Sequence, residues 1–172
     1  MCGIIGCVQR GGDCWPRVYD GLKRLEYRGY DSVGVAVLDQ NAIGIRKKKG
    51  GADALADAYL KGGAGIGHTR WATHGAPSDE NAHPHAAGKF ALVHNGIVEN
   101  FAALKEELVA AGEVFLSETD SEVIVKLISR AYTGDFLRAV RDGCARLEGS
   151  YAIAVLCEDF PDTVVCAKCK SP

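Results

Sequence analysis

Short apolar, β-rich runs predict that β-strands form both ends of the chain. Residues 32–39 and 42–49 are two such runs, and the Gln40-Asn41 pair between them is a plausible hairpin turn. The last two runs are also adjacent in sequence and predict a second hairpin. We expect strands at residues 2–8, 32–39, 42–49, 64–72, 89–96, 150–159 and 162–170.

Apolar residues that recur every three or four positions predict helices between these strands. In residues 14–26, for example, Val18, Leu22 and Leu25 would share one helical face. Thr119 followed by Glu122 fits a capping box ahead of another periodic run. We expect helices at residues 14–26, 53–63, 100–112, 119–134 and 135–149, and a loop at 76–88.

The order of these elements indicates the fold class. Strands dominate the two ends and helices cluster in the middle, so the chain is not a simple alternation of strand and helix. This order favours an α+β domain in which helices cover antiparallel sheets. A length of 172 residues, 47% of them hydrophobic, suits a single domain with a proper core.

Composition and charge narrow the range of partners and locations. The formal net charge is −2, which gives no reason to expect nucleic acid or an anionic membrane as a partner. No apolar run approaches the roughly 20 residues of a membrane span, and the first residues lack the pattern of a secretory signal. We therefore expect a cytoplasmic protein.

Seven cysteines are an odd number for a disulfide framework, and in a reducing cytosol they are better interpreted as buried or reactive thiols. Cys166 and Cys169 form the one tight pair. They lie on a predicted strand, where residues three apart face opposite sides, so shared metal or redox chemistry is disfavoured. We expect neither a metal nor a cofactor.

Cys2 allows two interpretations. It can be an ordinary small residue at the start of a strand. Alternatively, removal of Met1 would make it the amino terminus, with a thiol and an α-amine on one residue. That amine, with a pKa of about 7.7 to 8.0, could accept the proton of the thiol, so that a single residue would supply both nucleophile and base.

The segment from Gly67 to Gly75 carries the densest candidate chemistry. Arg70 offers a bidentate fork for a carboxylate, and Trp71 beside it could cover a small ligand. The alternative is that Trp71 and His68 belong to the core and that Arg70 pairs with a structural acid.

Two further candidates follow in the sequence. Asn95-Gly96 is first of all a turn signal, but an amide beside a glycine N–H can also form an oxyanion hole. Asp120 would complement the dipole of the helix it begins, or it could bind a ligand ammonium group. With Cys2 and Arg70, these residues describe an amidase that acts on the side-chain amide of an amino acid.

Six ordered motifs also carry a family resemblance. MCGIIG, LKRLEYRGYDSVGVA, GIGHTRWATHG, NAHPH, HNGIVENF and ETDSEVI together resemble the N-terminal glutaminase domain of the glutamine–fructose-6-phosphate aminotransferase (isomerizing) family. The resemblance extends along the whole chain. It implies a class II glutamine amidotransferase of the N-terminal nucleophile hydrolase type, with a four-layer αββα sandwich fold.

The resemblance also implies roles for individual residues. Cys2 would form a γ-glutamyl thioester and release ammonia, while Trp71 would gate the passage of that ammonia. Asn95 and Gly96 would form the oxyanion hole, and Arg70 and Asp120 would bind the backbone groups of L-glutamine. Thr73 and His74 would line the same pocket, and Arg28 would support the nucleophile.

The resemblance places the chain within a longer protein. The family's glutaminase domain continues past Ser171-Pro172, and its sugar-isomerase domains are absent. We therefore interpret residues 1–172 as a glutaminase domain that is incomplete at its carboxyl end. Fructose 6-phosphate would bind only through the missing domains, in a parent enzyme expected to be a homo-oligomer. The rival interpretations are the glutaminase of another class II enzyme, such as amidophosphoribosyltransferase, or an inactive glutamine-binding fragment.

Overall fold

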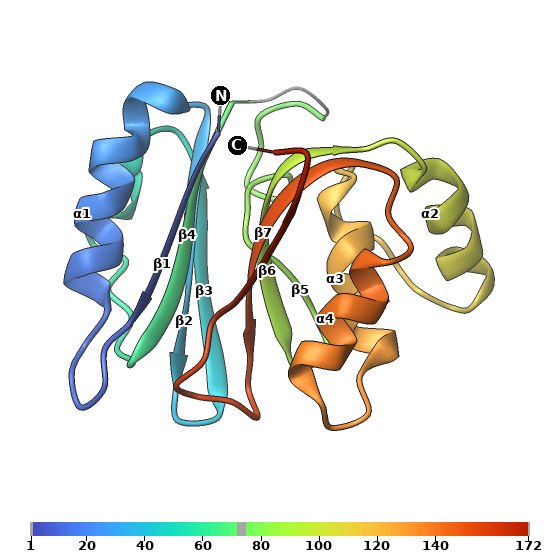
Figure 1. The fold of residues 1–172 in the computed structure, drawn as a ribbon. Helices are drawn as coiled ribbons and strands as arrows, with labels where there is room; N and C mark the ends of the chain where they lie inside the picture. The colour runs from blue at the N-terminus through green and yellow to red at the C-terminus, as the bar shows by residue number, and fades with distance from the viewer. Residues whose placement is uncertain (1, 72–74, 172) are drawn as a thin grey trace.

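Two four-stranded antiparallel sheets pack face to face in the computed structural model, which describes residues 2–71 and 75–171 (Figure 1). Helices lie on the outer face of each sheet, so the layers run helix, sheet, sheet, helix. This arrangement confirms the predicted α+β class and the four-layer sandwich. The described strands are β1 (Gly3–Val8), β2 (Ser32–Asp39), β3 (Ala42–Lys49), β4 (Ala64–Arg70), β5 (His85–Ala87), β6 (Phe90–Val98), β7 (Gly149–Cys157) and β8 (Val165–Cys169).

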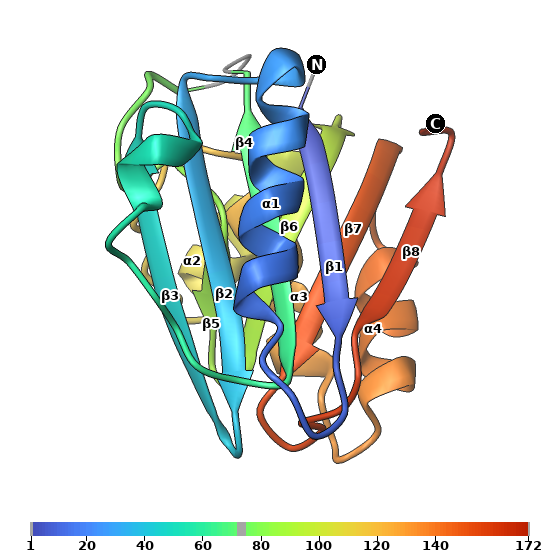
Figure 2. The ribbon, with the colours of Figure 1, turned by 90° about the vertical axis from the view of Figure 1, so that its left-hand side faces the viewer.

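The first sheet has the strand order β1-β4-β2-β3, and α1 (Trp15–Leu25) covers its outer face (Figure 2). The β2–β3 hairpin forms where the sequence predicts it, with Asp39 opposite Ala42. Val18 and Leu22 of α1 are buried against the sheet, and Gly67 of β4 leaves room for both side chains. The periodicity of residues 14–26 is therefore confirmed as a packed helical face.

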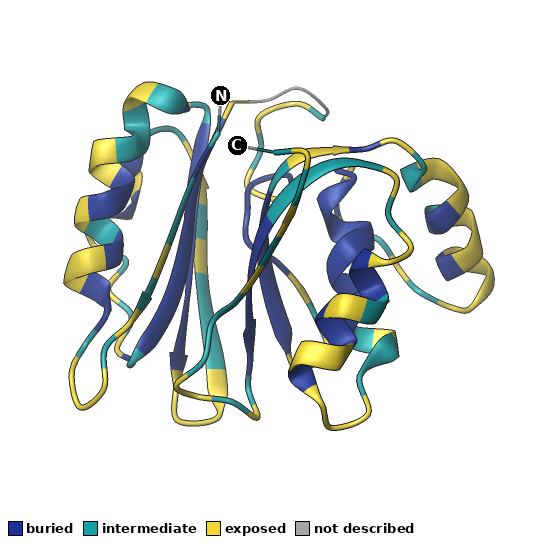
Figure 3. Ribbon diagram, viewed as in Figure 1, coloured by how far each residue is buried: buried dark blue, intermediate teal, exposed yellow. Residues whose placement is uncertain are grey.

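The second sheet has the order β5-β6-β7-β8 and is covered by α3 (Ser121–Ala131) and α4 (Phe136–Cys144). The predicted hairpin of β7 and β8 is confirmed, with Val155 opposite Val165. The helix α2 (Phe101–Ala110) lies further out, and only Leu104 and Leu108 of it are buried. In Figure 3 the buried positions follow the strands and the inner sides of α1, α3 and α4.

A thin apolar layer fills the space between the sheets. Four of its members are alanines, which let the two sheets approach each other closely. Its buried residues are Ala36, Leu38, Ala64, Ile66, Ala91, Val93, Ala154 and Leu156. In β4 the even-numbered residues face this layer, whereas in β6 the odd-numbered residues do. The alternation carries the inner face of β4 onward to His68 and Arg70, and that of β6 onward to Asn95.

Two expectations about local structure are wrong. The predicted helix at 53–63 is only a short 3-10 helix (Ala52–Leu55), and the chain has no regular structure from residue 58 to residue 62. The predicted loop at 76–88 contains β5, whose three residues are too few to show a periodic pattern. Lys47 of β3 is half-buried, and its Nζ donates to the carbonyl oxygens of Glu80 and Ala82.

The capping box is also absent. Asp120 rather than Thr119 is the N-cap of α3, and its side chain makes no capping bond to the helix. The Glu122 carboxylate instead accepts hydrogen bonds from the N–H groups of Leu116 and Ser117, at 3.1 and 2.7 Å. It thereby fixes the segment that leads into α3. Among the described helices, none is long and apolar enough to cross a membrane.

The layer between the sheets can be tested with a pair of leucines. Leu156 is fully buried there, whereas Leu137 on α4 is 67% exposed. Leu156→Ala should lower the free energy of unfolding by about 2–5 kcal/mol, because it removes buried apolar contacts and leaves a cavity. Leu137→Ala should change it by no more than about 0.5 kcal/mol. Urea unfolding of both variants measures the difference, and equal losses would contradict the assigned core.

Candidate active site

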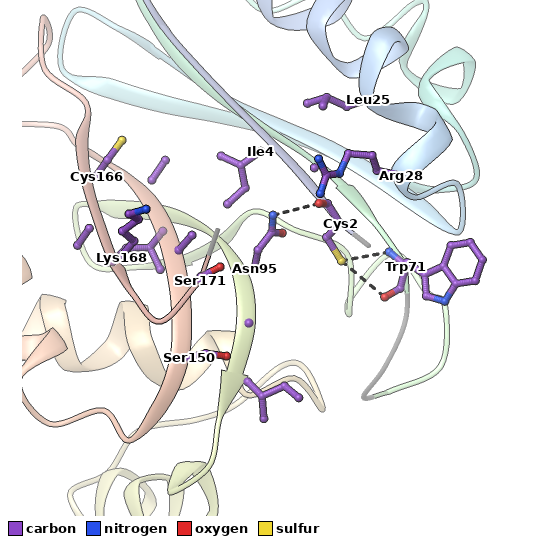
Figure 4. A pocket seen from close by; sticks show the side chains of 17 residues that line it. Cys2, Ile4, Leu25, Arg28, Trp71, Asn95, Ser150, Cys166, Lys168 and Ser171 are labelled. Atoms are coloured by element: carbon purple, nitrogen blue, oxygen red, sulfur yellow. Dashed lines mark hydrogen bonds between the residues drawn. The ribbon is translucent and has the colours of Figure 1, made fainter.

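The Cys2 thiol lies at the end of the layer between the sheets, against the main chain that follows β4 (Figure 4). Its Sγ accepts a hydrogen bond from the Trp71 N–H at 3.3 Å and is 3.6 Å from the Trp71 carbonyl oxygen. An N–H donor directed at sulfur stabilises negative charge on it. Both of these described contacts of the thiol are with backbone atoms.

Asn95 approaches the same cysteine from the second sheet. Its Nδ2 donates to the Cys2 carbonyl oxygen at 3.1 Å, and its Oδ1 is 2.8 Å from His68 Nε2. A side-chain amide carries two N–H donors, so a second one remains available beside the thiol.

Gly96 supplies the neighbouring backbone N–H. At the end of β6, the Glu99 N–H points toward the β7 side and donates to the Glu148 carbonyl oxygen. The Val98 N–H, one residue earlier, points the other way and donates to the Asp120 carboxylate. The alternation of an antiparallel ladder puts the Gly96 N–H on the Val98 side, where β5 has already ended. Gly96 has a φ of 140°, and a Cβ there would collide with the Ser150 carbonyl oxygen, so only glycine fits.

Arg70 and Asp120 bring opposite charges to this site. Arg70 is 4% exposed, and its Nη2 donates to the Gly75 carbonyl oxygen at 3.0 Å. Asp120 is 8% exposed, and its Oδ2 accepts the Val98 N–H at 2.8 Å. The Ser121 hydroxyl, which is 2.8 Å from His94 Nδ1, donates to Asp120 Oδ1 at 3.4 Å. The carboxylate is therefore held from two sides.

Two cavities meet at the thiol. The smaller, of about 40 Å³, is polar and is bounded by Cys2, Arg70, Asn95, Gly96 and Asp120 among others. The larger, of about 770 Å³, lies between the sheets and shares Cys2, Trp71, Asn95 and Gly96 with the first. In Figure 4 its far side is formed by β8. Cys2, Asn95 and Gly96 thus lie where the two spaces join.

The structure brings together six of the residues that the sequence singled out, namely Cys2, Arg70, Trp71, Asn95, Gly96 and Asp120. Arg28 lines the larger cavity beside Cys2. Thr73 and His74 lie outside the described residues, as does Met1.

The Trp71 side chain does not cover the site. It is 47% exposed and packs edge-on against Tyr30, with 5.3 Å between ring centroids. Figure 4 shows the indole pointing away from Cys2. What residue 71 gives to the site is therefore its backbone.

Sequence reasoning assigned no role to His83, His85 and His94, and it considered His68 only as a possible core residue. His94 Nδ1 contacts the Ser121 hydroxyl, and His68 Nε2 contacts the Asn95 amide oxygen. The ring of His83 packs on that of His68, with 4.1 Å between ring centroids. For His68 and His94 the signal was present in the motifs, since each follows the apolar residues of a strand. Which face each one occupies depends on the strand register, which the sequence does not reveal.

Burial keeps these histidines neutral. Desolvation lowers the pKa of His68 to about 4, and it lowers those of His83 and His85 well below the usual value. Burial also lowers the pKa of His94, although the charge of Asp120 opposes the shift. No group of three or more potential metal ligands occurs among the described histidine, cysteine and acidic residues.

Other thiols differ from Cys2 in their surroundings. Burial raises the pKa of Cys14 to about 12, and it also raises those of Cys144 and Cys157. These buried thiols therefore remain protonated near neutral pH and are poor nucleophiles. They form no disulfides, since all seven cysteines are free.

Comparison with known proteins places this geometry in context. Residues 45–166 match the family described as the glutamine amidotransferase domain. The chain is 53% identical to the glutamine–fructose-6-phosphate aminotransferase (isomerizing) of Symbiobacterium thermophilum over 178 residues, and 49% identical to that of Thermus thermophilus over 180. Both alignments cover 100% of this chain and 29% of the relative.

A solved structure shows the same fold. The glutamine phosphoribosylpyrophosphate amidotransferase from B. subtilis, complexed with ADP and GMP, superposes with a TM-score of 0.81 at 26% identity. The superposition covers 98% of this chain and 37% of that one. The chain therefore spans less than a third of the length of the curated relatives it matches, and a little over a third of this structural neighbour.

The buried histidines predict a loss of stability in acid. Between pH 6.5 and 4 the unfolded chain binds protons that folded His68 does not, so stability falls as pH falls through this range. Each such histidine contributes at most about 1.4 kcal/mol per pH unit. His83→Leu should make urea-derived stability less dependent on pH, and a curve parallel to that of the unmodified chain would contradict the assignment.

Proposed function

The chain belongs to the glutamine amidotransferase family, and on this basis we propose that it hydrolyses the side-chain amide of L-glutamine, with Cys2 as the nucleophile. The observation that carries the proposal is the meeting of one thiol with two oxyanion donors and two opposite charges at one cavity. Removal of Met1 is part of the proposal, because it frees the α-amine of Cys2 to act as a base.

The proposed reaction proceeds through a thioester. The α-amine takes the thiol proton, Cys2 Sγ attacks the side-chain carbonyl carbon, and Asn95 and Gly96 donate to the resulting oxyanion. The tetrahedral intermediate collapses with cleavage of the C–N bond, and the α-ammonium group returns its proton to the departing ammonia. A water molecule, deprotonated by the same amine, then attacks the thioester and releases glutamate and the thiol.

Substrate recognition would use the two buried charges. Arg70 would bind the α-carboxylate of glutamine through its planar fork, and Asp120 would bind the α-ammonium group. Both are pre-positioned by backbone contacts, with Gly75 and Val98 respectively. We assign Thr73 and His74 to the same pocket by family resemblance. The 40 Å³ cavity is smaller than a typical ligand site, so binding requires these walls to separate.

The ammonia acceptor is proposed from the relatives. Proteins named glutamine–fructose-6-phosphate aminotransferase match the whole chain at 46–53% identity. This supports transfer of ammonia to fructose 6-phosphate bound in a further part of the polypeptide, with Trp71 gating its passage. The rival acceptor, phosphoribosylpyrophosphate, has weaker support, because the phosphoribosylpyrophosphate amidotransferase is only 26% identical to this chain. We also propose a cytoplasmic location, because the relatives are named as metabolic enzymes.

Covalent labelling tests the nucleophile. A diazoketone analogue of glutamine should add once, to Cys2, and intact-mass analysis should show that Met1 has been removed. Cys2→Ala should abolish both labelling and glutamine hydrolysis, whereas Cys7→Ala should retain both because Cys7 lies further along β1. Retention of Met1 in an active preparation, or an adduct on another thiol, would refute the proposed base and nucleophile.

The oxyanion hole is tested by removing one donor. Asn95→Ala should lower kcat for glutamine hydrolysis by about 100- to 1,000-fold, equivalent to about 2.7–4 kcal/mol of transition-state stabilisation. Asn100→Ala removes an amide that binds Arg146 and Glu148 away from the site, so its kcat should be unchanged. Steady-state ammonia release measures both variants, and near-normal turnover in Asn95→Ala would exclude the oxyanion role.

A further inference from the structure

A hydrogen bond between the two sheets holds the oxyanion amide from behind. His68 lies on β4 of the first sheet and Asn95 on β6 of the second, and both face the layer between them. His68 is 1% exposed, and its Nε2 is 2.8 Å from Asn95 Oδ1. His68 is not among the residues that bound either cavity at Cys2.

The direction of this bond follows from the other end of the amide. The Cys2 carbonyl oxygen can only accept, so the amide group 3.1 Å from it must be the NH2 of Asn95. The oxygen of the same amide then faces His68, and His68 Nε2 must donate. Burial lowers the pKa of His68 to about 4, so near neutral pH the ring carries one proton, and that proton resides on Nε2.

We propose that His68 is a positioning residue, whose Nε2–H fixes the side-chain amide of Asn95 with its NH2 group toward the oxyanion. This inference rests on the proposed glutaminase function. With the amide rotated by 180°, its oxygen would face both the Cys2 carbonyl and the developing negative charge. A fixed donor costs no reorganisation during the reaction, whereas a rotating amide offers a donor only part of the time.

The His68 ring is itself held in place. The ring of His83 packs against it, with the two planes inclined by 40°. The backbone of residue 83 in turn packs directly against β2. The approach is so close that a Cβ on Gly34 would overlap the His83 carbonyl oxygen. The support therefore extends from β2 through two imidazoles to the Asn95 amide.

A double-mutant cycle on glutamine hydrolysis tests this role. His68→Leu should lower kcat by up to about 100-fold, the size expected for misplacing a catalytic group by about 1 Å, with a much smaller change in KM. In the Asn95→Ala background the same substitution should have no further effect, because His68 acts only through that amide. Independent, multiplicative losses would overturn the proposal.

Two other variants separate positioning from general damage. His68→Gln retains an N–H donor at a similar reach and should recover most of the lost kcat. His85→Leu removes another buried histidine, whose Nε2 contacts the Thr119 hydroxyl. It should keep kcat within about twofold, while lowering the free energy of unfolding by about as much as His68→Leu does. Failure of the glutamine variant to rescue, or an equal loss of kcat in His85→Leu, would count against the assigned role.

Nitrogen NMR provides a test that does not depend on turnover. The ring nitrogen shifts of His68 at pH 7 should show the Nε2–H tautomer, and the Nε2 signal should move in Asn95→Ala. An Nδ1–H tautomer would overturn the proposal even in an active protein. If instead the unmodified chain releases no ammonia while His68 shows the expected tautomer, the proposed function fails and the hydrogen-bond geometry stands.

Discussion

The close packing of two sheets through a layer of small side chains is the constraint on which the site depends. Ala64 and Ile66 of β4 face Ala91 and Val93 of β6 across that layer. Where the apolar pattern of both strands ends, the same alternation presents polar side chains to each other at the same separation. The site is therefore the polar end of the core, and its geometry is inherited from the packing beneath it.

The sequence was sufficient for the repeating parts of this architecture. Neighbouring β-rich runs predicted both hairpins, and the candidate chemistry of Arg70, Asn95 and Asp120 anticipated a shared pocket. It was insufficient where tertiary contacts outweigh local pattern. The carboxylate of Glu122 bonds backward to Leu116 and Ser117 instead of completing a capping box, and three-residue β5 depends on its partner β6.

The link between His68 and Asn95 illustrates the limit most clearly. Each residue appears in a recognisable motif, but their contact requires the register of two sheets and the distance between them. Neither quantity is encoded in local periodicity. The neutral state of the histidines is likewise a product of burial, since an exposed imidazole would titrate near pH 6.5.

The Cys2 thiol contacts the main chain of residue 71 and not its side chain, so the two parts of this residue are under different evolutionary constraints. The backbone N–H and carbonyl that meet Sγ belong to any amino acid except proline, which lacks the N–H, so they exert little selection on the side chain. The indole, packed on Tyr30 at the surface, is correspondingly free to evolve for a task other than holding the thiol. One position can thus serve the chemistry through its peptide group and a second purpose through its side chain, each able to change without the other.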